Sequence, residues 1–256
     1  MLFEPKATSY DLRWRMLGIP VRVNPWFWLI GVFLGYYKGI SLTELAVWIA
    51  CVFASILLHE FGHALTARRF GARGVRVVLY QMGGLAIHEG GPTRKQRIVE
   101  LCMGPGAGFI LWAFLFAPEQ LGWVRYDQLP RLAGLAARDL LHINLMWGLL
   151  NLIPVYPLDG GQILREALLL RGRPGANMRA MRLSMLFGIL AALGFLGYGL
   201  VQKWDLRDIL LPVVLFGAFA YYSYQLSKPE YQEAFETERP RDPWERDPDW
   251  WKQGGR

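Results

Sequence analysis

The chain has 256 residues and a formal net charge of +7, with 53% hydrophobic and only 19% charged residues. Soluble domains contain about 25% charged residues, so this composition excludes a disordered or fibrous chain and argues against a compact soluble domain. Both cysteines lie in apolar runs, which argues against a disulfide framework and a cysteine-ligated metal site. The composition therefore predicts a protein that resides in a lipid bilayer.

Six stretches of the sequence are apolar over the roughly 20 residues that a membrane-spanning helix needs. They are residues 24–40, 43–66, 98–117, 133–154, 182–202 and 206–226. The fourth contains charged side chains, which are tolerated only where they face protein or the membrane interface. We expect an all-α membrane protein with six transmembrane helices over residues 24–226, a cytoplasmic N-terminal segment over residues 1–23 and a loosely ordered cytoplasmic tail over residues 227–256.

The basic residues outside and at the ends of these spans indicate their orientation. From the N-terminal segment to the tail, successive segments carry 4, 1, 7, 3, 5, 2 and 6 Lys or Arg residues. Because cytoplasmic loops are enriched in these residues, the alternation predicts that both termini lie in the cytoplasm. The N-terminal segment has no early apolar run, so it is not expected to be a cleaved signal peptide. The basic balance is a topology signal and gives no ground for a nucleic-acid partner.

Residues 74–88, in the loop after the second span, contain two β-prone runs on either side of Gly83 and Gly84. Such runs around a glycine turn are typical of a β-hairpin. We therefore add a small cytoplasmic or membrane-associated hairpin to the predicted fold.

The second span ends in an H-E-x-x-H pattern formed by His59, Glu60 and His63. Residues four apart share one face of a helix, so both imidazoles can reach one metal ion. Glu60 can then stand beside the bound water as a general base. The alternative is a buried polar cluster that helps helices pack, although a His-Glu-His set inside an apolar span is costly unless it has a use. The remaining histidines, His88 and His142, stand in no comparable pattern.

Two histidines leave a catalytic zinc site one protein ligand short, and Asp159 is the candidate for the third. It follows Pro157 and precedes two glycines, so we expect it on irregular backbone surrounded by protein or a water-filled cavity. The second and fourth spans both run toward the cytoplasmic face, so His59, His63 and Asp159 can share one depth near it. The sequence predicts one zinc ion per chain, with an open position for water.

With both motifs in place, the chain resembles the site-2 protease family of intramembrane zinc metalloproteases, peptidase family M50. The resemblance covers residues 18–226 and rests on residues 57–71, which include the H-E-x-x-H pattern, and on residues 151–161, which include Pro-Leu-Asp-Gly-Gly. It implies that His59, His63 and Asp159 ligate zinc. It also implies that Glu60 is the catalytic base, which takes a proton from water and passes it to the leaving amine.

The resemblance also implies residues that bind substrate. Asn151 matches a family asparagine near the active site, which implies a role in holding the substrate or a developing oxyanion. Gly83 and Gly84 resemble the turn of the family's β segment, whose edge could take an unwound substrate as an added strand; a purely structural cap stays open as the alternative. The chain departs from the family at Gly108, where many members have an asparagine.

The function implied is hydrolysis of a peptide bond within or near the transmembrane segment of a membrane-protein substrate, with a single-span substrate expected. The resemblance places the chain in the lipid bilayer of the inner or plasma membrane.

Three alternative functions fit the sequence less well. A proteolytically inactive metal-binding scaffold is disfavoured because His59, Glu60, His63 and Asp159 are all present. A zinc peptidase of prenylated proteins would use a glutamate or histidine as third ligand. A transporter would show two halves with broken helices, and none are evident.

Overall fold

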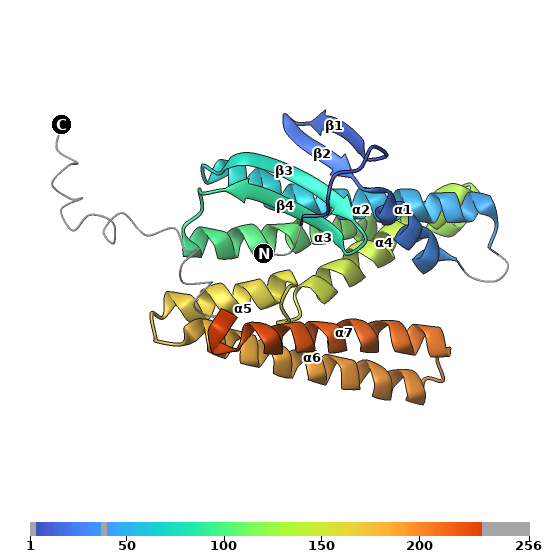
Figure 1. Cartoon of the computed structure of the whole chain (residues 1–256). Helices are drawn as coiled ribbons and strands as arrows, with labels where there is room; N and C mark the ends of the chain where they lie inside the picture. Colours follow the sequence, from blue (N-terminus) through green and yellow to red (C-terminus); the bar gives the residue numbers. More distant parts are fainter. Residues whose placement is uncertain (1–3, 37–39, 232–256) are drawn as a thin grey trace. The chain divides into compact units, whose positions relative to one another are not determined.

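The computed structural model describes residues 4–36 and 40–231, which divide after Arg173 into two compact units (Figure 1). The first unit contains β1 (Leu12–Met16), β2 (Ile19–Val23), α1 (Pro25–Gly35), α2 (Leu42–Arg69), β3 (Arg73–Tyr80), β4 (Gly83–Glu89), α3 (Arg94–Gln120), the 3-10 turn η1 (Tyr126–Gln128), α4 (Arg131–Asn151) and α5 (Asp159–Leu170). The second unit contains α6 (Ala176–Val201) and α7 (Leu206–Leu226). The predicted tail lies, from residue 232 onward, outside the described residues.

The strands form one sheet in the order β1-β2-β3-β4. The hairpin predicted at residues 74–88 is confirmed as β3 and β4, with Leu79 opposite Gly84. The prediction was wrong in extent, because β2 adds to β3 in parallel, with Val21 opposite Val77, and β1 pairs with β2 antiparallel. Ile19, Val21 and Val23 are buried and alternate with more exposed residues. This two-residue period is the strand signal that the basic N-terminal segment contained.

The N-terminal residues before β1 are tied to the sheet by charge. Glu4 accepts hydrogen bonds from Arg22 on β2, at 2.8 Å, and from Arg76 on β3, at 2.9 Å. The hydrogen bond from Arg76, helped by the nearby charge of Arg22, holds the pKa of Glu4 below its ordinary value. Glu4 therefore links two parallel strands that are far apart in the sequence.

Figure 1 shows β3 and β4 running along α2 and α3, and α2 contacts both strands. The core between them is apolar, with Val23, Ile56, Phe61 and Leu79 all buried. α2 begins with a capping box between Ser41 and Glu44, in which each side chain accepts a hydrogen bond from the backbone amide of the other residue. The sheet and α2 therefore share one hydrophobic core, and the H-E-x-x-H pattern lies on this helix.

Four helices of the described chain are long and apolar enough to cross a membrane: Leu42–Arg69, Arg94–Gln120, Ala176–Val201 and Asp208–Leu226. They correspond to the second, third, fifth and sixth predicted spans. The first predicted span contains the eleven-residue helix α1, which is apolar but short. The fourth is α4, a helix of 21 residues that includes Arg138 and Asp139. The chain is thus a mostly helical membrane protein with a four-stranded sheet, and the count of six spans stays a prediction.

The backbone after α4 turns sharply and then starts a helix that was not predicted. Asp159 is the first residue of α5, so the expectation that it lies on irregular backbone was wrong. Gly160 and Gly161 do not adopt positive φ angles. A Cβ on Gly160 would lie 2.2 Å from the carbonyl oxygen of Leu152, and one on Gly161 would lie 2.2 Å from the amide nitrogen of Tyr156. The two glycines therefore let the turn fold back against the start of α5.

Candidate metal centre

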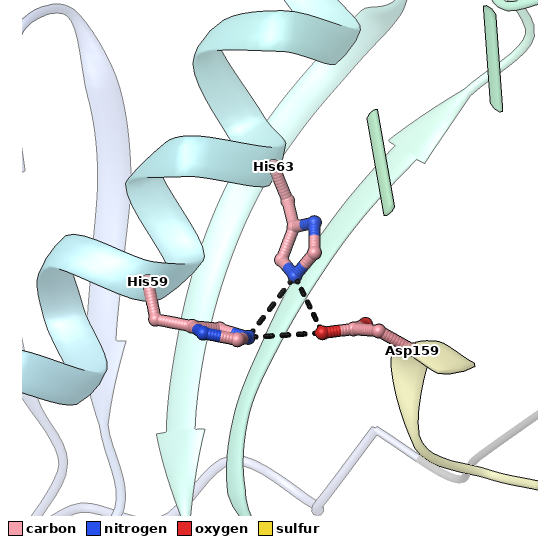
Figure 2. Close-up of side chains that lie close together, drawn as sticks. All are labelled: His59, His63 and Asp159. Carbon is pink, nitrogen blue, oxygen red and sulfur yellow. Dashed lines mark hydrogen bonds and ion pairs between the residues drawn. The ribbon is translucent and has the colours of Figure 1, made fainter. Parts of the chain in front are cut away.

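Three buried side chains from two distant parts of the chain point toward one another (Figure 2). His59 and His63 come from adjacent turns of α2, and Asp159 comes from the first turn of α5. Oδ2 of Asp159 lies 3.1 Å from Nε2 of His59 and 3.3 Å from Nε2 of His63, and the two nitrogens are 3.1 Å apart. The structure thus brings together the three residues that the sequence singled out.

The triangle fits a tetrahedral metal. Zinc bonds of about 2.0–2.1 Å place neighbouring tetrahedral ligand atoms about 3.3 Å apart. The three observed separations have this size. Within the described residues, this is the one group of three or more His, Cys, Asp or Glu side chains arranged to hold a metal ion. Two imidazoles and one carboxylate leave a fourth position for water, as catalytic zinc sites do.

His63 is held in the orientation that a metal ligand needs. Its Nδ1 donates a hydrogen bond to the backbone carbonyl of Glu100 on α3, at 2.8 Å. A carbonyl oxygen only accepts, so Nδ1 carries the proton and Nε2 keeps its lone pair for a metal. Gly104 on α3 provides the space for this ring, because a Cβ there would lie 2.1 Å from Nε2 of His63.

Glu60 lies beside this triangle and against strand β4. Its side chain is buried, and its carboxylate accepts a hydrogen bond from the backbone amide of Ala86. A Cβ on Gly84 would lie 2.3 Å from Cγ and 2.5 Å from Oε1 of Glu60. The Glu60 carboxylate therefore occupies space that a side chain at position 84 would fill.

We expect Gly84→Ala to lower peptide hydrolysis about 100-fold, because a displacement near 1 Å of a catalytic group has an effect of that size. Zinc content should stay normal, since Gly84 approaches Glu60 and the three candidate ligands lie on other elements. Activity and metal content measured on the same purified sample test this. A Gly84→Ala protein with full activity would show that Glu60 tolerates the shift.

A cavity of about 150 Å³ opens beside the triangle and is lined by His59, Glu60, His63, Asp159, Gly84, Trp147 and Asn151 among others. Nδ2 of Asn151 donates to the carbonyl of Trp147 at 2.9 Å, one turn earlier on α4. A Cβ on Gly83 would lie 2.7 Å from the Trp147 ring. The candidate substrate residues Asn151 and Gly84 thus reach the cavity, whereas Gly83 packs beneath a ring that lines it.

Gly108, where the family resemblance leads one to expect an asparagine, faces a different asparagine. A Cβ on Gly108 would lie 3.3 Å from Oδ1 of Asn144 on α4. Nδ2 of Asn144 donates to Oγ of Ser55 on α2 at 2.9 Å, whereas its Oδ1 has no hydrogen-bond partner among the described residues. The small size of Gly108 therefore allows α3 and α4 to pack closely at this point.

Sequence reasoning missed one group beside the site, formed by His88, Arg97, Glu100 and Gln162. Glu100 is only 1% exposed although it is charged and lies inside the third predicted span. A charge in such a place is by itself a signal of function or pairing. That signal was available in the sequence, but the contact of Glu100 with His88 on β4 and the bond from Arg97 to Gln162 on α5 were not.

Comparisons with known proteins were consistent with this geometry. Residues 47–121 and 137–195 match the model of peptidase family M50. A zinc metalloprotease of Methanocaldococcus jannaschii is 29% identical over 82% of this chain and 60% of its own length. Stage IV sporulation protein FB of Bacillus subtilis is 27% identical over 59% of this chain and 49% of its own. The chain therefore spans about half to three fifths of these relatives.

A solved structure, described as a site-2 protease from Methanocaldococcus jannaschii, is similar in fold. It aligns with a TM-score of 0.56 and 28% sequence identity, and the alignment covers 86% of this chain and 96% of the other. The likeness in fold covers most of the chain. The two segments that match the family model contain both regions that carry the candidate site.

Proposed function

We propose that this chain, which belongs to peptidase family M50, is an intramembrane zinc metalloprotease that hydrolyses a peptide bond within or near the transmembrane segment of a membrane-protein substrate. The observation that carries the proposal is the triangle of His59, His63 and Asp159 with Glu60 beside it. Membership of the family supports the activity, and the donor set supports zinc. No observation favours an inactive metal-binding scaffold.

In this proposal His59, His63 and Asp159 hold one zinc ion per chain. When bound, zinc supplies a Lewis acid for water and for the scissile carbonyl. Glu60 accepts the proton of the attacking water and delivers it to the leaving amine. Burial of Glu60 and its hydrogen bond from Ala86 hold the carboxylate at the wall of the cavity.

We further propose that β4 binds the substrate as an extended strand. β4 is at one edge of the sheet and its backbone approaches Glu60, so a strand added there would run past the catalytic carboxylate. The absence of side chains at Gly83 and Gly84 lets Trp147 and Glu60 approach this strand closely. Asn151 lines the cavity, where its carboxamide can bond a substrate carbonyl or amide.

The apolar helices support residence in a lipid bilayer. We propose that the membrane is the inner or plasma membrane, that both termini face the cytoplasm and that the substrate spans the membrane once. The alternating Lys and Arg content of the loops supports this orientation.

Asp159→Ala is expected to lower the zinc content of the purified protein from about one ion per chain to below about one tenth, because only two of three protein ligands remain. Asp127→Ala is the matched control, since Asp127 lies on η1 with its side chain 53% exposed. Metal analysis after dialysis measures both variants. Normal zinc stoichiometry in Asp159→Ala would remove Asp159 from the ligand set.

A further inference from the structure

Glu100 is a buried carboxylate that depends on a neighbouring guanidinium. Its Oε1 accepts a hydrogen bond from Nη1 of Arg97, one turn earlier on α3, and lies 3.0 Å from Nε2 of His88 on β4. Its Oε2 has no hydrogen-bond partner within the described part of the chain. A carboxylate this deeply buried is stable only when it is paired. Arg97 therefore fixes the side chain of Glu100 and, through it, this turn of α3.

This turn of α3 is also the one that orients His63. The backbone carbonyl of Glu100 accepts the hydrogen bond from Nδ1 of His63. Any shift of Glu100 along α3 would move that carbonyl and, with it, the ring of His63. Glu100 thus accepts a hydrogen bond from Arg97 on its side chain and one from the candidate metal ligand His63 on its backbone.

The same guanidinium reaches the segment that carries Asp159. Nη2 of Arg97 donates to Oε1 of Gln162 on α5 at 3.3 Å, and Nε2 of Gln162 donates to the carbonyl of Pro157 at 3.0 Å. Pro157 and Gln162 flank Asp159 in the sequence, two residues before it and three residues after it. One side chain therefore connects the anchor of His63 with the turn that presents Asp159.

We propose that Arg97 is a positioning residue of the metal centre, which holds the Asp159 turn at a set distance from His59 and His63 by bridging Glu100 and Gln162. Arginine suits this role because its planar fork donates in two directions at once, which a lysine ammonium on a flexible stem does not do in fixed geometry. The inference rests on the zinc site proposed above. The side chain of Arg97 lines the cavity, and the inference assigns it a role through the protein groups that its terminal nitrogens contact, Glu100, His88 and Gln162.

The chain supplies a matched control on the same pair of helices. Arg94, three residues before Arg97 on α3, donates to Glu166 on α5 at 3.0 Å. This ion pair also links α3 with α5, but neither Glu100 nor Gln162 takes part in it. Arg94→Lys therefore reports the effect of weakening a general contact between the two helices.

The experiment measures the zinc dissociation constant of the purified full chain by competition with a chelator, for Arg97→Lys, Gln162→Leu, the double variant and Arg94→Lys. Arg97→Lys is expected to weaken zinc binding about 10- to 100-fold, the range found when the residues behind metal ligands are changed. Gln162→Leu, which leaves Glu100 paired, is expected to act in the same direction. The double variant should lose less than the product of the two single effects, because both remove one bridge. Arg94→Lys should stay within about twofold of the parent.

The absorption spectrum of the cobalt-substituted protein gives a second readout, since it reports ligand geometry independently of proteolysis. The band positions should shift in Arg97→Lys and Gln162→Leu and stay unchanged in Arg94→Lys. Equal zinc affinity in all variants with a raised KM for Arg97→Lys would overturn the inference and make Arg97 a substrate contact. Equal weakening by Arg94→Lys and Arg97→Lys would overturn it in favour of general helix docking. A parent chain that binds no zinc would overturn the proposed function itself.

Discussion

Replacing Glu60 with glutamine is expected to abolish peptide hydrolysis while zinc stays bound at its normal stoichiometry. The carboxamide has the shape of the carboxylate, so it can keep the place beside Gly84 and the hydrogen bond from Ala86. It cannot accept the proton of the attacking water. Loss of a general base lowers rates by about 100- to 10,000-fold, which would leave no cleavage visible in cells.

Quantitative proteomics of membrane fractions measures this effect on all membrane proteins at once, so no single substrate has to be chosen. Intact single-span proteins should accumulate in cells that carry Glu60→Gln, and the corresponding released fragments should disappear. Glu89→Gln is the matched control, because it makes the same chemical change at the exposed end of β4. Membrane proteomes that are identical in Glu60→Gln and parent cells would contradict the assigned role of Glu60.

Replacing Gly104 with alanine is expected to disrupt the metal centre. The new methyl group would lie 2.1 Å from Nε2 and 2.4 Å from Cε1 of His63. The ring cannot retreat without breaking its hydrogen bond to Glu100. Separation of the helices would disrupt close packing, because α2 and α3 approach so near that a Cβ on Gly62 of α2 would lie 2.1 Å from the carbonyl oxygen of Met103.

We therefore expect Gly104→Ala to weaken zinc binding more than about 100-fold, at least as much as a change behind a metal ligand. Hydrolysis should be lost with the metal. Gly106→Ala provides the control on the same helix, since the nearest atom to a Cβ there is Sδ of Met103 at 4.0 Å, an ordinary contact. Chelator competition on both variants measures the difference. Equal zinc affinity in the two variants would show that α3 can move away from His63.

Local sequence patterns were enough to predict the chemical groups of the site. The four-residue spacing of His59 and His63 depends only on the helical repeat, and the structure places both rings on one face of α2. Asp159 was reached from the chemical need for a third ligand and from the context of prolines and glycines. Its distance to both histidines agrees with that interpretation, although it begins a helix.

Long-range packing decided what the sequence could not predict. The period of two in β2 is visible in the sequence, but its parallel partner β3 lies more than fifty residues later in the chain. Gly84 and Gly104 look like ordinary turn and helix glycines until Glu60 and His63 are found against them. The bridge from Arg97 to Gln162 joins residues 65 positions apart. Such contacts depend on how elements pack, and a single sequence carries no local sign of them.

The central claim is tested most directly by proteolysis in a reconstituted membrane. The purified chain would be placed in vesicles with a single-span protein that accumulates in Glu60→Gln cells, and the products would be mapped by mass spectrometry. The account predicts one cut within or next to the transmembrane segment that is lost on zinc chelation, restored by added zinc and absent with Glu60→Gln. Cleavage by the Glu60→Gln chain at the parent rate, or a cut that persists after complete removal of zinc, would contradict it.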